Sequence, residues 1–298
     1  MTLVRAVWAV APDGVRVRVA LTPVEGARGT ILIFPGRTEV VEKYGKVAGR
    51  FAAAGWASAS IDWRGQGLAD RLLEDPDIGH VARFGDYQSD VAAYLDTVRG
   101  ILPEPFVLLG HSMGGAIGLR AVLDGLDVRA AGFSAPMWGI FMPPLQAPFN
   151  LALAKAMDLL GRGRTRAPTT PRHSYLLESR FAGNTLTTDE GEWAYMRAQV
   201  EAEARFGLGG PSIHWLRESL KECAALVHAP PRALPLLAGM GSREQIVSKP
   251  AIRTRVGTWP GAELVEIEGA RHELMMERPD LREQFETRLL DFFAAACA

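Results

Sequence analysis

Residues 107–123, VLLGHSMGGAIGLRAVL, decide the fold of this chain. The apolar run from Val107 to Leu109 has no helical spacing and predicts a short buried strand. The pattern Gly-x-Ser-x-Gly follows at 110–114, and the next residues, rich in small side chains, predict a helix. A tight turn of this kind forces its serine into a strained backbone conformation, while the flanking glycines let strand and helix approach. Ser112 is therefore expected to project from the carboxyl edge of a parallel sheet.

A Gly-rich turn with an exposed serine is the alternative for this motif. With Gly and Ser each near 7% of residues, a chance match occurs in roughly one chain in ten of this length. The motif alone is therefore weak. The predicted strand before it and the helix after it, with Gly114, Gly115, Ala116 and Gly118 where that helix must press on the sheet, favour the nucleophile.

The composition limits what the rest of the chain can be. With 298 residues, 48% of them hydrophobic, the chain has room for one large α/β domain, or one domain with an insertion. Two cysteines, Cys223 and Cys297, argue against a disulfide framework or a thiolate metal site. The formal net charge is −1, and the basic cluster Arg162, Arg164 and Arg166 stands alone, which argues against nucleic acid as the main partner.

The first twenty residues alternate apolar and polar side chains and include Arg5, Asp13 and Arg16. This pattern predicts neither a signal peptide nor a membrane span, so we expect a cytoplasmic protein.

Strands and helical patterns alternate through the first 135 residues. An antiparallel hairpin is expected from 3–10 and 15–21, joined at Pro12-Asp13-Gly14. The other expected strands are 29–34, 57–61, 105–109, 128–134, 234–238 and 262–267, and the expected helices include 40–54, 86–99, 248–257 and 279–296. This alternation predicts a doubly wound α/β fold with a mostly parallel central sheet and helices on both faces.

Between the expected strands 128–134 and 234–238, residues 136–231 show helical patterns and several prolines but no clear buried strand. We therefore expect an α/β core at 1–135 and 232–298 and an inserted helical cap at 136–231. The apolar residues of the insertion either line an acyl pocket or form its own core: 137–142, Trp193, Trp215 and Leu216.

A serine nucleophile needs a base, and the base needs a carboxylate to orient it. In this fold the chain order is Ser, acid, His. Of the six histidines, only His272 lies just beyond the last predicted strand. The loop after strand 234–238 contains one carboxylate, Glu244, which is the predicted acid; Glu273 is the competitor. His111 is expected to pack under the turn, and the remaining histidines are expected at the surface.

Two backbone N–H groups are needed to stabilise the oxyanion, one from the residue after the nucleophile and one from the loop after the first parallel strand. Met113 supplies the first. The second lies in the Phe34-Pro35-Gly36-Arg37 loop, where we expect the main chain of Arg37, because Pro35 has no N–H group.

Five segments carry a resemblance to a known family: PGRTEVVEKYG at 35–45, DWRGQGLADR at 62–71, GHSMGG at 110–115, NTLTTD at 184–189 and GARHELMMERPDLR at 269–282. They resemble the bacterial lysophospholipases of the serine-aminopeptidase and monoacylglycerol-lipase group of α/β-hydrolases. The similarity covers most of the chain. The chain departs from the group's pattern in having Pro35-Gly36 where monoacylglycerol lipases have His-Gly, and Glu244 where many relatives have Asp.

The resemblance implies an α/β-hydrolase fold with a helical cap, the triad Ser112, Glu244 and His272, and hydrolysis of a fatty-acyl ester in a lysophospholipid or monoacylglycerol. Alternatives are an esterase or amidase acting on small soluble substrates, and a non-enzymatic binding protein that keeps the fold. No cofactor or metal is expected, since no metal or nucleotide motif is present. The apolar cap is a candidate for transient contact with a membrane surface; the oligomeric state is left open.

Overall fold

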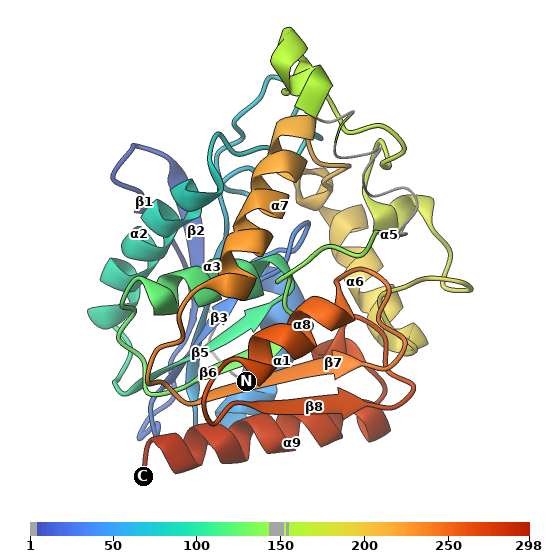
Figure 1. Cartoon of the computed structure of the whole chain (residues 1–298). Coiled ribbons are helices and arrows are strands. Elements are labelled where there is room, and N and C mark those ends of the chain that lie inside the picture. The colour runs from blue at the N-terminus through green and yellow to red at the C-terminus, as the bar shows by residue number, and fades with distance from the viewer. Residues whose placement is uncertain (1–4, 143–151, 153–154) are drawn as a thin grey trace.

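In this computed structural model, residues 5–142, 152 and 155–298 are described. They form one eight-stranded sheet in the order β1-β2-β4-β3-β5-β6-β7-β8 (Figure 1). The strands are β1 Arg5–Val10, β2 Arg16–Thr22, β3 Thr30–Phe34, β4 Ala57–Asp62, β5 Phe106–His111, β6 Ala131–Ser134, β7 Leu236–Gly241 and β8 Glu263–Ile267. Strand β2 runs antiparallel to both its neighbours, and every pair from β4 to β8 is parallel. The predicted hairpin and mostly parallel sheet are both present.

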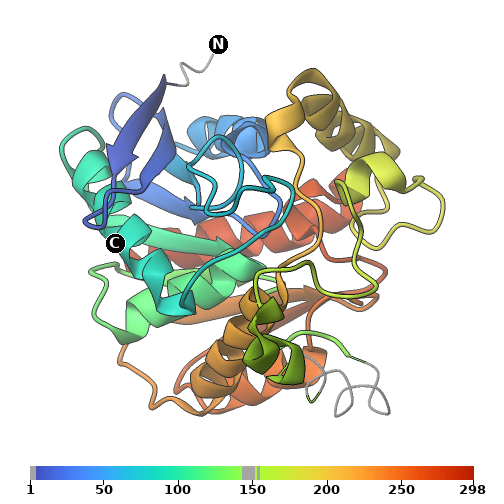
Figure 2. The ribbon, with the colours of Figure 1, turned by 90° about the horizontal axis from the view of Figure 1, so that it is seen from above.

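Helices cover both faces of this sheet, as Figure 2 shows from above. The α-helices are α1 Gly45–Ala53, α2 Tyr87–Arg99, α3 Met113–Leu123, α5 Tyr175–Glu178, α6 Glu190–Ala202, α7 Ile213–His228, α8 Lys249–Gly257 and α9 Pro279–Ala296. Short turns of other helix types are η1 Val41–Tyr44, η2 Phe84–Asp86, η3 Asp158–Arg162, η4 Ala204–Phe206 and η5 Leu274–Met276. Helices α1 and α9 pack on one face, and α2, α3 and α8 pack on the other.

Successive side chains of β5 point to opposite faces of the sheet, so this one strand contributes to the apolar core on both faces. Val107 and Leu109 belong to the apolar core shared with α1 and α9, whereas Leu108 belongs to the core shared with α2 and α3. All three side chains are fully buried. A strand buried on both faces is a continuous apolar run in sequence, which is the pattern that predicted it.

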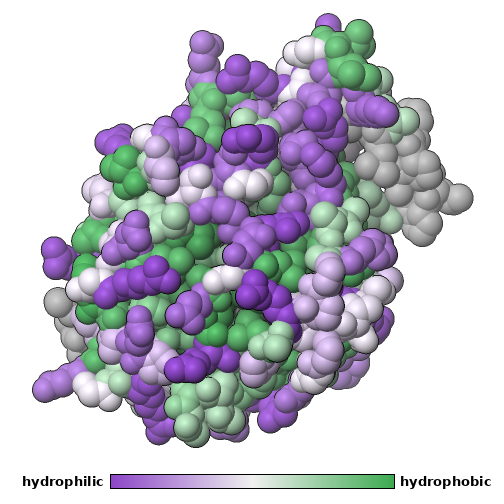
Figure 3. Space-filling model, turned by 60° about the vertical axis from the view of Figure 1, so that its left-hand side comes forward, coloured by the Kyte–Doolittle hydropathy of each residue, from purple (hydrophilic) through white to green (hydrophobic). Residues whose placement is uncertain are grey.

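The segment between β6 and β7 contains α5, α6 and α7, which are drawn above β7 and β8 in Figure 1. Among its described residues, none adds a strand to the sheet. Its division from the core as a cap at 136–231 stays a prediction, and residues 143–151 and 153–154 of it lie outside the description. None of the helices in the described part is long and apolar enough to cross a membrane. Hydrophilic side chains are spread over the face seen in Figure 3, with smaller hydrophobic areas between them.

One histidine differs from the sequence-based expectation. His80 is buried rather than at the surface, because its Nδ1 forms a 2.8 Å hydrogen bond with Ser212 Oγ at the start of α7. Burial lowers the pKa of His80 to about 4, so this ring is neutral at pH 7.

Candidate active site

Ser112 stands at the turn between β5 and α3 with φ 49° and ψ −118°. This left-handed conformation is uncommon for a residue with a side chain and marks a strained turn. Two glycines make room for it. A Cβ on Gly110 would lie 2.8 Å from the Gly114 carbonyl oxygen, and a Cβ on Gly114 would collide with the backbone of Phe34. The serine hydroxyl is thus held at the carboxyl end of the sheet by local sterics.

His272 and Glu244 come from loops after β8 and β7 and meet in a buried hydrogen bond. The distance from His272 Nδ1 to Glu244 Oε2 is 2.7 Å. The other carboxylate oxygen, Oε1, accepts the backbone N–H groups of Ile246 (2.6 Å) and Val247 (3.1 Å). These three bonds fix the carboxylate, so its orientation also fixes that of the imidazole.

The charges of this pair support each other. Burial opposes ionisation of Glu244, but the nearby imidazole and the hydrogen bonds outweigh it and lower the pKa of that carboxyl. Burial also disfavours the imidazolium, yet Glu244, with smaller contributions from Glu273 and Glu39, raises the pKa of His272. A base with a raised pKa beside an ionised acid is the arrangement that accepts a serine proton.

Ser112 and His272 line one pocket, although no hydrogen bond between Ser112 Oγ and the ring is recorded in this structure. Catalytic hydrogen bonds are often long before substrate binds. The structure therefore brings the three predicted residues Ser112, Glu244 and His272 to one place, and their catalytic roles stay predictions.

The two predicted oxyanion donors are Met113, the first residue of α3, and Arg37, which lines the same pocket as Ser112. In the described part of the chain, no hydrogen bond engages the backbone N–H of Arg37 or of Met113. The neighbouring Gly36 N–H differs, because it donates to Glu39 Oε2. Gln66 holds the loop in place: its Nε2 donates to Gly36 O at 2.8 Å, and its Oε1 accepts the Thr38 N–H at 3.3 Å.

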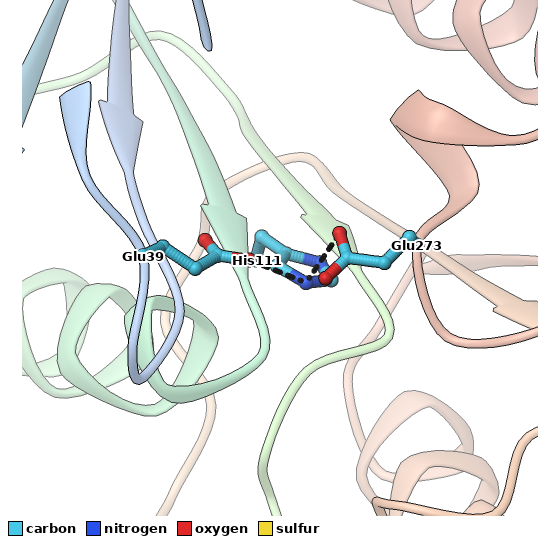
Figure 4. A group of neighbouring side chains, drawn as sticks. All are labelled: Glu39, His111 and Glu273. Atoms are coloured by element: carbon cyan, nitrogen blue, oxygen red, sulfur yellow. Dashed lines mark ion pairs between the residues drawn. The ribbon is translucent and has the colours of Figure 1, made fainter. Parts of the chain in front are cut away.

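A buried group of charged side chains lies directly behind His272. Figure 4 shows His111 between Glu39 and Glu273. His111 Nε2 lies 3.4 Å from Glu39 Oε1 and 3.2 Å from Glu273 Oε2, while its Nδ1 donates to Ser134 O at 3.0 Å. Lys43 Nζ contacts both carboxylates, at 2.7 Å from Glu273 Oε2.

This arrangement separates Glu273 from the role of acid. Burial alone would favour the neutral carboxyl, but Lys43 and His111 hold the pKa of Glu273 well below its ordinary value. Its carboxylate is committed to those two groups, whereas the ring of the adjacent His272 turns to Glu244. Sequence reasoning missed Lys43 and Glu39; their i,i+4 spacing inside the PGRTEVVEKYG segment was the available signal.

Glu39, His111 and Glu273 also form a group of metal-ligand type, since their ligand atoms all lie within 4.8 Å of one another. The ammonium of Lys43 already contacts both carboxylates and supplies positive charge at that position. Because this ammonium already lies between the two carboxylates, we treat the group as part of the support of the site.

The loop that carries His272 is tied to residues 184–189. Glu273 N–H donates to Leu186 O at 2.9 Å, and Thr187 Oγ1 donates to Met276 O at 2.7 Å. Asn184 Oδ1 accepts the N–H groups of Leu186 and Thr187, at 2.8 and 3.0 Å, which closes the turn that makes these bonds possible. The NTLTTD segment thus fixes the position of the histidine loop.

The pocket has a volume of about 440 Å³ and a largely apolar wall. The apolar lining residues include Met137, Ile140, Leu176, Leu208, Trp215 and Leu216. Four residues of the predicted apolar set, Met137, Ile140, Trp215 and Leu216, therefore line a pocket, and its use as an acyl pocket stays a prediction. Trp193 does not line the pocket but packs edge-on against Tyr175, with ring centroids 6.0 Å apart. Trp138 is buried against Phe133 and donates to Gly115 O at 3.1 Å.

The family model of serine aminopeptidase, S33, matches residues 25–279. The chain belongs to this family. The S33 chain is 33% identical over 283 residues to lysophospholipase L2 of Escherichia coli strain K12, covering 88% of this chain and 79% of that protein. It is 25% identical over 269 residues to a probable lysophospholipase L2 of Haemophilus influenzae, covering 89% and 83%.

Among solved structures, a soluble variant of monoglyceride lipase from Saccharomyces cerevisiae superposes on the S33 chain with a TM-score of 0.77. The identity is 18%, and the match covers 99% of this chain and 97% of that one. The fold is therefore that of an α/β-hydrolase, as the sequence resemblance implied. The S33 chain is a carboxylic ester hydrolase, which leaves the non-enzymatic alternative without support.

Proposed function

We propose that this hydrolase cleaves the fatty-acyl ester of a lysophospholipid or monoacylglycerol through an acyl-enzyme intermediate. The observation that carries the proposal is the buried Glu244–His272 hydrogen bond facing the same apolar pocket as Ser112. Relatives named lysophospholipase L2 support the substrate class. An apolar pocket of this size suits an acyl chain.

In the first half-reaction, His272 Nε2 accepts the hydroxyl proton as Ser112 Oγ attacks the ester carbonyl carbon. Glu244 stabilises the imidazolium that forms, and the backbone N–H groups of Arg37 and Met113 donate to the oxyanion of the tetrahedral intermediate. The imidazolium then protonates the leaving alcohol as the ester C–O bond breaks. In the second half-reaction, water gives a proton to His272 and attacks the acyl carbon. The imidazolium then returns the proton to Ser112 Oγ as the acyl C–O bond breaks, and the fatty acid leaves.

The test is hydrolysis of p-nitrophenyl esters from acetate to palmitate, together with lysophosphatidylcholine and monoacylglycerol. We expect activity that rises with chain length in the wild-type protein and is lost in Ser112→Ala with the fold intact. Activity confined to acetate and butyrate would favour the alternative, an esterase or amidase of small substrates. A Ser112→Ala variant within tenfold of wild type would overturn the nucleophile. A fluorophosphonate probe, followed by mass spectrometry, checks covalent attachment at Ser112.

We propose that η3 and its surroundings meet a membrane surface transiently. Leu159 and Leu160 are 75% and 78% exposed there, beside the exposed Arg162. The segment around η3 forms the top of the molecule in Figure 1, and Figure 3 shows a small hydrophobic area at the top as well. Apolar side chains beside basic ones are typical of interfacial binding. Leu159→Asp should reduce sedimentation with anionic vesicles; unchanged sedimentation would contradict the proposal. A cytoplasmic location stays a prediction from the sequence.

A further inference from the structure

Arg37 is a cation in the pocket without a carboxylate partner in the described part of the chain. Among the described residues, Tyr87 is the ionisable side chain that acts on its pKa, and this phenol is itself neutral at pH 7 because burial raises its pKa to about 12. Residues outside the description contain no Asp or Glu, so they offer no carboxylate either. Burial lowers the pKa of Arg37 to about 10, yet the group stays charged at pH 7.

The guanidinium is held firmly but uses few of its donors. It lies over the ring of Trp215, with its central carbon 5.3 Å from the ring centroid, and one terminal nitrogen donates to Gly209 O at 2.6 Å. Its Nε is buried and has no acceptor among the described residues. An arginine carries five N–H donors, so most of this group's capacity is left for a ligand. A fixed cation with unused donors is typical of an anion site.

The other cationic side chains that line the pocket already have carboxylate partners. Lys43 contacts both Glu39 and Glu273, and His272 is paired with Glu244. An anion entering the pocket therefore finds its uncompensated positive charge at Arg37. Arg37 and Ser112 line the same pocket, and the guanidinium contacts Gly209 O at one of its walls.

We propose that the Arg37 guanidinium binds the phosphate of a lysophospholipid headgroup and makes the enzyme prefer that substrate over a monoacylglycerol. The inference rests on the proposed function and narrows its substrate class. A glycerol unit separates ester and phosphate in a lysophospholipid, so one residue can serve both ends, its N–H at the oxyanion and its side chain at the phosphate. A guanidinium matches a phosphate with two parallel hydrogen bonds.

The experiment compares 1-decanoyl lysophosphatidic acid with 1-decanoylglycerol, which share the acyl group and the glycerol and differ only in the phosphate. The quantity measured is the ratio of kcat/KM for the two substrates. Arg37→Gln keeps the backbone N–H, so we expect the ratio to fall at least about tenfold, mainly through KM for the phospholipid. Arg37→Lys should restore part of the ratio. Arg253→Gln removes an exposed charge on α8 and should leave the ratio at its wild-type value.

An unchanged ratio in Arg37→Gln, or an equal loss on both substrates, overturns the inference. A second readout separates it from the proposed function. sn-Glycerol 3-phosphate should inhibit p-nitrophenyl butyrate hydrolysis competitively in the wild type, and this inhibition should disappear in Arg37→Gln. If the wild type hydrolyses the p-nitrophenyl ester but neither lipid, the proposed function fails while the inhibition still tests the phosphate site. Absence of inhibition in the wild type overturns the site itself.

Discussion

Replacing Glu244 by Gln tests the orientation of the base directly. In the structure, Oε1 accepts two backbone N–H groups and Oε2 accepts the ring proton on His272 Nδ1. A glutamine has one oxygen, and the two backbone donors would retain it. Its NH₂ group would then face Nδ1 and force the proton to Nε2, where the ring can no longer accept the serine proton.

The expected loss in kcat is about 10³–10⁴-fold, the order found when a triad carboxylate becomes an amide. This corresponds to roughly 4–5.5 kcal/mol of transition-state stabilisation. Glu244→Ala should lose less activity than Glu244→Gln, because alanine places no donor against the ring. The order of the two variants therefore separates a tautomer effect from simple loss of a contact.

The assay is kcat/KM for p-nitrophenyl butyrate as a function of pH. Activity requires neutral His272, so it falls as the pH drops through the pKa of that ring. Glu244 raises that pKa, and its removal leaves burial as the larger influence. In Glu244→Gln the acid limb should therefore move to lower pH while the plateau falls. Glu273→Gln is the matched control, and we expect a smaller loss. A Glu244→Gln variant with more than a tenth of wild-type activity, or a larger loss in Glu273→Gln, would refute the assignment.

Two further predictions concern the residues that support the site. Lys43→Met leaves Glu39 and Glu273 buried without their shared cation and should lower the free energy of unfolding in urea by about 3–5 kcal/mol; a change below 1 kcal/mol would contradict the buried ion pairs. Gly114→Ala places a methyl group against the backbone of Phe34 and should abolish soluble folding or activity. Gly49→Ala in α1 is the control, because a Cβ there meets nothing within 4 Å; it should be neutral or stabilise the protein by about 0.5–1 kcal/mol. Thermal unfolding followed by circular dichroism compares the two, and equal stability would contradict the packing.

Much of the fold was predictable because its signals are local. A strand buried on both faces is a continuous apolar run, and a strand-turn-helix with small residues is confined to 107–123. Several predicted strand bounds were shifted, and the largest extension is at 234–238, which is β7 Leu236–Gly241 in the structure. Gly239 and Gly241 have the composition of a loop, yet they pair with β8, and a Cβ at either position would collide with Phe285 or with the Ala270 carbonyl.

The buried charged residues behind His272 could not be predicted from the local sequence pattern. Lys43 and Glu39 are charged residues that composition assigns to the surface, and only the fold brings Glu273 to them. The burial of His80 has the same origin, because its partner Ser212 is distant in sequence. Glu244 was predicted as the acid because its loop has no second carboxylate, and the structure places it in a hydrogen bond with His272.

The bonds between residues 184–189 and the histidine loop have a consequence for protein engineering. One way to change the substrate range of such an enzyme is to replace the segment between β6 and β7 by that of a relative. In this protein, that segment also anchors Glu273 and Met276, on either side of the turn beside His272. A graft that alters the wall of the pocket would then release the base as well. Exchanges should therefore carry residues 271–277 together with 184–189 as one transplanted unit.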